Sequence, residues 1–281
     1  MKRVWWGIAA VALLSEVATT QCKVGKETNE AKLLAYYAAP LAFSPSGRLD
    51  RMAPGAVRAA FELTYIPAPG DELRQTSQCF APKEENSQLS PVLPRPRVAV
   101  GLPAGFFIEG TYLPPLTVAD ATPNMTSLAL GFVRQLGARL GLALRAHGTF
   151  GHVTGPITCD ADAVQNTNPN RACYGNAKSK DTYWPNIVGV ESALTWTGAG
   201  DGRFAGYVGG GYSSLRPRFK VGFQPANAPF DSTRVEVDLT RVAVLAGGRY
   251  RFSRKVDLTG EIYSVPKDVT TVRLGASLGL R

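Results

Sequence analysis

The chain has 281 residues and a formal net charge of +9, with 31 lysines and arginines against 22 acidic residues. A basic balance of this size invites a nucleic-acid interpretation, but the basic residues are scattered and form no run with interleaved aromatic residues. We therefore expect no nucleic-acid partner. No segment approaches the roughly 18 unbroken apolar residues that a membrane-spanning helix needs, so no transmembrane helix is expected.

The first 20 residues have the pattern of a secretory signal peptide. A basic pair precedes an apolar run over residues 4–14, which is too short to cross a bilayer alone, and smaller residues follow. Cleavage after Thr20 is acceptable because Ala18 lies two positions earlier. We expect an exported protein. Lipidation of Cys22 is an alternative, although the preceding Thr-Thr-Gln matches the small residues of a lipidation signal poorly.

From residue 57 to residue 280 the sequence alternates apolar and polar side chains. Between residues 139 and 150, leucine, alanine, glycine and phenylalanine share one parity, while arginine, histidine and threonine share the other with small residues. Successive side chains of a strand point to opposite faces, so each such segment predicts a strand with one apolar face. The segments with this pattern are 57–65, 97–102, 106–112, 127–132, 139–150, 188–196, 203–213, 241–252, 256–262 and 272–280.

The connections between these segments alternate in length. Those at one end are short, at 103–104, 135–137, 198–202 and 253–254. Those at the other end are longer, at 67–94, 113–124, 151–186, 215–238 and 264–270. Short turns that alternate with long loops between strands of about ten residues are typical of bacterial outer-membrane barrels.

Residues 56–281 thus resemble, in architecture rather than in a motif, the small outer-membrane β-barrels of the OmpA-like and porin superfamily. The resemblance implies an all-β fold, an antiparallel up-and-down transmembrane β-barrel of about ten strands (eight to twelve) with short periplasmic turns and long outer loops. Residues 21–55 would form a periplasmic or plug-like N-terminal segment, in which 32–43 could add a strand or a short helix. The chain departs from the family by ending on arginine rather than on an aromatic residue.

A soluble β-sandwich or lipocalin-like barrel would also alternate, but its polar face would look outward and carry lysine and glutamate. Here the polar parity carries glycine, alanine, serine and arginine, which suit a tight interior. This difference favours the bacterial outer membrane as the location.

Aromatic residues support the barrel independently. Outer-membrane barrels carry aromatic girdles at both interfaces, on the face that contacts lipid. Aromatic residues of lipid-facing parity fall at the predicted outer ends (Tyr65, Tyr112, Phe150, Tyr212) and inner ends (Phe106, Phe132, Trp196, Phe204, Tyr250, Phe252). We expect these rings to contact the lipid bilayer, which is the partner that this fold implies.

Charged residues gather on the inward parity. They are Arg58, Glu62, Arg97, Glu109, Arg139, Arg145, His147, Glu191, Arg203, Arg241, Arg249, Arg251, Asp257, Glu261 and Arg273. Arginine suits such an interior because its planar guanidinium pairs with carboxylates bidentately. The pattern predicts a lumen-lining ion-pair network with an electropositive excess.

This interior allows two functions. Either the charges hold the interior shut and the barrel is a structural scaffold or surface-interaction protein that acts through its outer loops, or the excess arginine lines a narrow anion-favouring channel for small anionic solutes. Side chains fill a barrel of about eight strands, whereas about sixteen leave an aqueous channel, so about ten strands favour the scaffold. A second alternative is a secreted soluble β-barrel that binds a small apolar ligand.

Four cysteines in an exported chain favour disulfides. Cys159 and Cys173 share one long loop and form the easier pair, worth ~3 kcal/mol in the chain-entropy model. Cys22 and Cys79 belong by topology to opposite sides of the membrane. Their pairing would require residues 22–55 to enter or thread the lumen, and an unpaired Cys79 or a lipidated Cys22 is the alternative.

No constellation predicts an enzyme, a metal site or a cofactor. His147 and His152 could act as general bases, but no partner has a matching position. We interpret His147 as an interior hydrogen-bonding residue and His152 as a loop residue. The oxygen-rich stretch 160–170 lacks the central glycine and terminal glutamate of a calcium loop. The outer loops, with aromatic residues such as Tyr183 and Phe223, remain the best candidates for recognition unless these rings pack the loops together.

Overall fold

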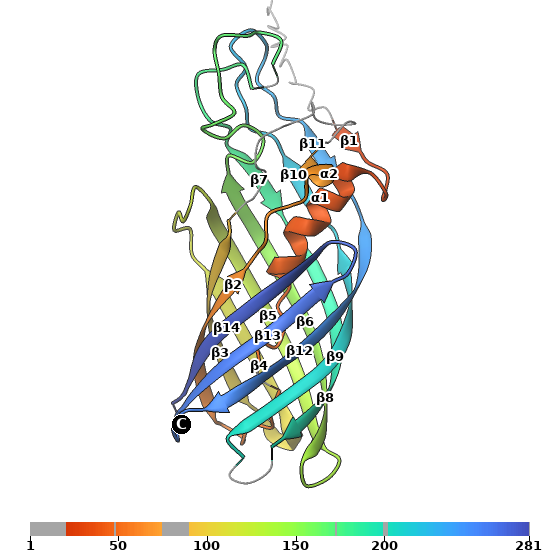
Figure 1. Cartoon of the computed structure of the whole chain (residues 1–281), viewed down its shortest axis with the longest axis vertical. Helices are drawn as coiled ribbons and strands as arrows, with labels where there is room; N and C mark the ends of the chain where they lie inside the picture. The colour runs from red at the N-terminus through yellow and green to blue at the C-terminus, as the bar shows by residue number, and fades with distance from the viewer. Residues whose placement is uncertain (1–20, 48, 75–89, 172, 199–201, 281) are drawn as a thin grey trace, which may run out of the picture.

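The computed structural model describes residues 21–47, 49–74, 90–171, 173–198 and 202–280, so the predicted signal peptide lies outside the described part. Ten antiparallel strands close into a barrel, in which the last strand pairs with the first (Figure 1). The barrel strands are β2 (Val57–Tyr65), β3 (Val92–Gly101), β4 (Phe106–Leu113), β5 (Thr122–Gln135), β6 (Leu140–Gly155), β8 (Ile187–Thr197), β9 (Phe204–Leu215), β12 (Leu239–Arg251), β13 (Val256–Val265) and β14 (Val269–Gly279).

The predicted fold class and strand count are confirmed, and the barrel is apolar outside and polar inside. On β6, Leu140 and Leu144 are each 46% exposed, whereas Arg145 and His147 are buried. Every barrel strand has a partner on both sides, so the sheet closes on itself.

Strand β3 begins five residues earlier than its pattern predicts. The predicted connection 67–94 ends at Pro94, but Pro94 and Pro96 pair in register with Leu63 and Phe61 of β2. The pairing of β3 with β4 starts only at Val98, so both prolines lie where one edge of β3 has no ladder partner. Proline is tolerated there because it has no N–H to leave unpaired.

A small sheet extends from β6 beyond the long-loop end of the barrel (Figure 1). Its strands, in spatial order from β6, are β7 (Asp181–Trp184), β10 (Arg218–Lys220), β11 (Arg234–Glu236) and β1 (Gln21–Lys23). We call this the extension sheet. These strands have three or four residues each, too few for an alternation to reveal them. Strands β7, β10 and β11 lie within predicted long loops, and β1 lies in the predicted N-terminal segment.

The N-terminal segment runs through the barrel rather than below it. Helix α1 (Asn29–Ala38) lies at the long-loop mouth, and its N-cap Thr28 accepts a hydrogen bond from the Ala31 amide. The short helix η1 (Ala39–Leu41) follows, and the chain then descends to the opposite end, where the Gly55 amide donates to the carbonyl of Gly101. Two further short helices, α2 (Asp71–Arg74) and η2 (Pro103–Gly105), lie in connections.

This course places β1 on the side of the long loops. We expect an epitope inserted between Gly25 and Lys26, both exposed, to be labelled by antibody in intact cells. An epitope at Asn168 in a long loop serves as the positive control, and one at Gly137 in a short turn as the negative control. Labelling at Gly25 only after permeabilisation, together with Gly137, would contradict the threading.

Candidate functional site in the barrel lumen

The predicted girdle residues lie on the outer surface of the barrel, away from the lumen. Eight of the ten predicted girdle residues are at least 40% exposed: Tyr65, Phe106, Tyr112, Phe150, Trp196, Phe204, Tyr212 and Phe252. Phe132 and Tyr250 are half-buried against their neighbours Phe106 and Phe204, with ring centroids 4.9 and 4.8 Å apart. The candidate site is therefore sought among the charged side chains of the lumen.

Seven arginines in the lumen each lie within 4.0 Å of a carboxylate. The pairs are Arg58–Asp50 (3.9 Å), Arg95–Glu62 (3.7 Å), Arg97–Glu62 and Arg97–Glu109 (2.9 Å), Arg145–Glu109 and Arg145–Glu191 (3.1 Å each), Arg241–Asp268 (2.7 Å), Arg249–Asp257 (3.7 Å) and Arg249–Asp50 (4.0 Å), and Arg273–Glu261 (3.6 Å). Among the described residues, seven arginines face seven acids, so this part of the network carries no formal net charge. Shared carboxylates link neighbouring strands around the lumen.

The segment 39–47, which we call the lumen segment, supplies the remaining acceptors. Arg95 donates to the carbonyls of Leu41 (3.3 Å) and Ala42 (3.2 Å), and Arg273 also donates to Ala42 (3.2 Å). Arg145 donates to the carbonyl of Phe43. These guanidinium groups therefore bind backbone as well as carboxylates.

The Phe43 ring lies at the centre of the arginines. The guanidinium carbons of Arg97, Arg145 and Arg95 are 4.3, 4.8 and 5.8 Å from its centroid, and the ring has no exposed surface. A desolvated cation over an aromatic face is stabilised by about 2 kcal/mol. Phe43 thus stabilises the like-charged guanidinium groups that surround it.

On the other side of the lumen, Glu261 binds the same segment. Its carboxylate accepts from the Ser46 amide (3.0 Å) and from the hydroxyl groups of Ser44 and Tyr207. The Gly47 amide donates to the Tyr207 hydroxyl at 2.8 Å. Gly47 has a φ of +84°, and a Cβ there would lie 2.6 Å from Cβ of Thr259, so only glycine fits.

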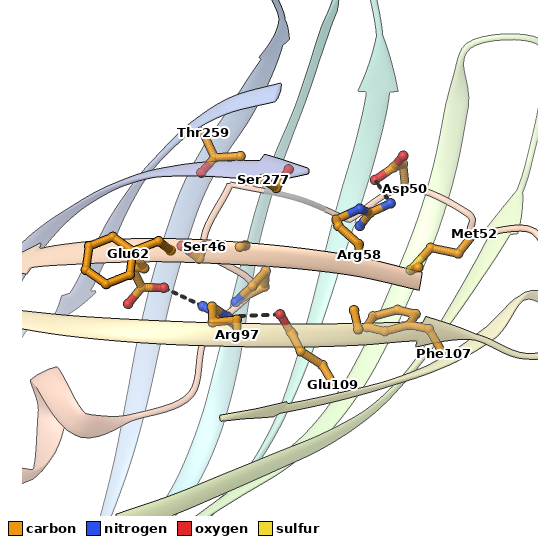
Figure 2. A pocket seen from close by; sticks show the side chains of 14 residues that line it. Ser46, Asp50, Met52, Arg58, Glu62, Arg97, Phe107, Glu109, Thr259 and Ser277 are labelled. Atoms are coloured by element: carbon orange, nitrogen blue, oxygen red, sulfur yellow. Dashed lines mark hydrogen bonds and ion pairs between the residues drawn. The ribbon is translucent and has the colours of Figure 1, made fainter. Parts of the chain in front are cut away.

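A cavity of about 30 Å³ adjoins the network in the half nearer the short turns (Figure 2). Figure 2 shows Arg97 between Glu62 and Glu109, with Asp50 facing Arg58 at the far side of the cavity. Met52 and Phe107 contribute apolar surface to its wall. Because its charged side chains are already paired, the cavity offers space for water rather than for an unmatched charge.

His147 lies in the same interior, buried on β6. Its Nε2 is 3.5 Å from Glu191 Oε1, beyond ordinary hydrogen-bond distance. The ring packs over Gly189, where a Cβ would come within 2.7 Å of Nε2.

Among the described residues, no group of three or more histidine, cysteine or acidic side chains could hold a metal ion. No helix in that part of the chain is long and apolar enough to cross a membrane.

Most of the predicted lumen residues lie in this network, with two differences. Arg139, Arg203 and Arg251 have inward parity but are exposed near the short turns. Fully buried Arg95 was missed because the adjacent prolines disguised its strand, although it shares the parity of Arg97.

The described residues of the network do not have the predicted electropositive excess. Three of the nine expected arginines lie at the rim. Asp50 and Asp268, which lie outside the predicted strands, add two acids that strand parity could not reveal.

The long loops are packed together. The predicted disulfide Cys159–Cys173 is confirmed, with its Cα atoms 5.6 Å apart. Cys22 is also disulfide-bonded, which leaves no thiol there for lipidation, and Cys79 lies outside the described residues.

Burial raises the pKa of Tyr183 well above its usual value, and its hydroxyl donates to the carbonyl of Leu34 at 2.7 Å. Tyr183 and Phe223, candidates for recognition, are both buried and pack the loops instead.

No protein-family model matches the chain, and no curated protein sequence matches it. Solved outer-membrane barrels share its architecture. Ail, the attachment invasion locus protein of Yersinia pestis, is 8% identical over 81% of this chain and 98% of its own, with a TM-score of 0.34. The outer membrane protease OmpT from Escherichia coli is 8% identical over 80% and 94%, with a TM-score of 0.38. Neisserial surface protein A is 11% identical over 79% and 95%, with a TM-score of 0.27.

The network predicts a large cost for removing one cation. Arg97→Met leaves Glu62 and Glu109 without their nearest positive charge, and breaking a buried pair in this way lowers the free energy of unfolding by about 3–5 kcal/mol. Arg134→Met on the exposed side of β5 is the matched control, with an effect within about 0.5 kcal/mol. Urea unfolding of the folded protein in detergent measures both, and equal stabilities would show that the ion pairs contribute little.

Proposed function

We propose that the protein is a closed outer-membrane β-barrel that serves as a rigid scaffold and presents its long loops and extension sheet at the cell surface. The observation that carries the proposal is the occupied lumen. The lumen segment fills the centre of the barrel, where Phe43 has no exposed surface and accepts a hydrogen bond from Arg145 through its carbonyl. A barrel whose lumen is filled by its own chain is better suited to hold surface loops in place than to transport solutes.

The outer surface supports the membrane location. Large apolar side chains from the barrel strands are more than half exposed around the wall, such as Leu128 (60%), Val190 (57%) and Leu274 (62%), while Arg97, Arg145 and Arg273 are buried inside. A soluble barrel would expose that apolar surface to water at a cost of about 25 cal/mol per Å². The aromatic girdles at both ends match the lipid interfaces, and by analogy with outer-membrane barrels the long loops face outward.

Two features count against the channel alternative. Ions would have to pass Leu41, Phe43 and Arg273, none more than 5% exposed, so the path is closed at the level of the arginines. The equal numbers of arginines and carboxylates among the described lumen residues also count against an anion preference. His147 packs against Gly189 within this closed interior, which favours a packing role over acid–base catalysis.

Conductance tests the proposal. The full-length protein, reconstituted in a planar lipid bilayer, is expected to show no stepwise conductance, because its lumen is blocked. A variant lacking residues 21–54 is expected to conduct, with only weak selectivity, because seven arginines then face six acids. Faster migration of the unboiled variant on a detergent gel verifies that it folds. Regular conductance steps from the full-length protein would contradict the proposal.

A further inference from the structure

The outward face of the extension sheet carries a diagonal band of cations. Lys220 on β10 lies directly opposite Arg234 on β11, and Lys180, which precedes β7, donates through its amide to the carbonyl of Gly222, two residues beyond β10. Lys23 on β1 lies in register with Glu236 and two residues along the strand from Gln21, the partner of Arg234. We call Lys23, Lys180, Lys220 and Arg234 the cationic band.

Within the described part of the chain, Lys180, Lys220 and Arg234 have no carboxylate in register, and only Lys23 lies opposite one, Glu236, which is also 3.5 Å from Arg218. None of its four side chains has an ion pair or hydrogen bond to the described residues, and all except half-buried Lys220 are exposed. The acids nearby are already engaged, since Arg218 lies 3.5 Å from Glu236 and 2.9 Å from Asp238. Like charges directly opposite each other on neighbouring strands are destabilising. An external anion would relieve this repulsion.

The band faces away from the barrel axis, because the alternate residues of the same strands are buried. Tyr183 contacts α1 through its hydroxyl, and Phe219 and Val235 are also buried. The band therefore continues the lipid-facing side of β6, on which Phe150 belongs to the aromatic girdle. Thr154 of β6 is in register with the extension sheet and lies about 13 Å along the strand from Phe150.

This height matches the polar region just above the bilayer core. The aromatic girdle marks the interface, and a tilted strand that rises about 13 Å further reaches the level of lipid headgroups. Between the two levels, the rings of His152 and Trp184 pack 6.3 Å apart on the same face. An aromatic layer with cations above it is the order in which a membrane presents apolar chains and then phosphates.

We propose that the cationic band binds phosphate groups of outer-leaflet lipids and so fixes the tilt and height of the barrel in the membrane. The proposal rests on the outer-membrane location and orientation proposed above. Charge complementarity identifies the ligand, because several neighbouring unpaired cations above a lipid-facing wall match phosphorylated headgroups. The band also accounts for part of the +9 charge of the chain, which the balanced lumen leaves unexplained.

The test measures the binding of purified lipopolysaccharide to the full-length protein in zwitterionic detergent. Each basic residue near an anionic lipid surface contributes about fivefold, so the triple variant Lys180→Gln, Lys220→Gln, Arg234→Gln is expected to bind about a hundredfold more weakly. The triple change Arg134→Gln, Arg254→Gln, Lys255→Gln near the short turns removes the same charge from exposed positions and should leave binding nearly unchanged. Chemically dephosphorylated lipopolysaccharide should bind the wild type as weakly as the intact lipid binds the first variant.

Equal losses in the two triple variants, or tight binding of the dephosphorylated lipid, would overturn the proposal. Equally tight, band-dependent binding of a soluble sulfated polysaccharide would overturn the lipid assignment in favour of a soluble anion. If the triple variant does not fold, Arg234→Gln at an exposed position is expected to lose about fivefold, and no loss overturns the proposal. Migration of the boiled and unboiled wild type on a detergent gel is measured separately. If the wild type forms no folded barrel, that result counts against the proposed function rather than against lipid binding by the cationic band.

Discussion

Buried arginine side chains impose the constraint on which the rest of this structure depends. A guanidinium group in a dry interior costs several kcal/mol unless carboxylates neutralise it and acceptors meet its N–H groups. Carboxylates on the barrel strands supply the charge. The carbonyls of the lumen segment, at Leu41, Ala42 and Phe43, supply acceptors that inward side chains cannot. The charged wall and the segment inside it therefore stabilise each other.

The same constraint explains the course of the chain. The lumen segment can meet the arginines only by passing along the barrel axis, so β1 and α1 lie at one mouth and β2 begins at the other. The extension sheet then joins β1 to the long loops through parallel pairing with β11. A segment of about 35 residues thereby closes the lumen and ties the loops to the barrel.

The sequence predicted the features that depend on local pattern. Period-two alternation identified all ten barrel strands, and loop membership identified the Cys159–Cys173 disulfide. Contacts between distant segments were not predictable, because no local pattern marks Asp50 as the partner of Arg58 or a carbonyl as the acceptor for Arg95. The predicted charge excess failed for this reason, since strand parity counts the arginines but not the acids that loops contribute.

The most direct test of the account is hydrogen–deuterium exchange of residues 39–47 in the folded, lipid-reconstituted protein. The amides of Ser46 and Gly47 belong to no helix or strand, and they donate to Glu261 and Tyr207. We predict that these amides exchange as slowly as those of the barrel strands, because only the lumen contacts protect them. Exchange as fast as that of the short turn at Gly137 would show that the segment does not close the barrel.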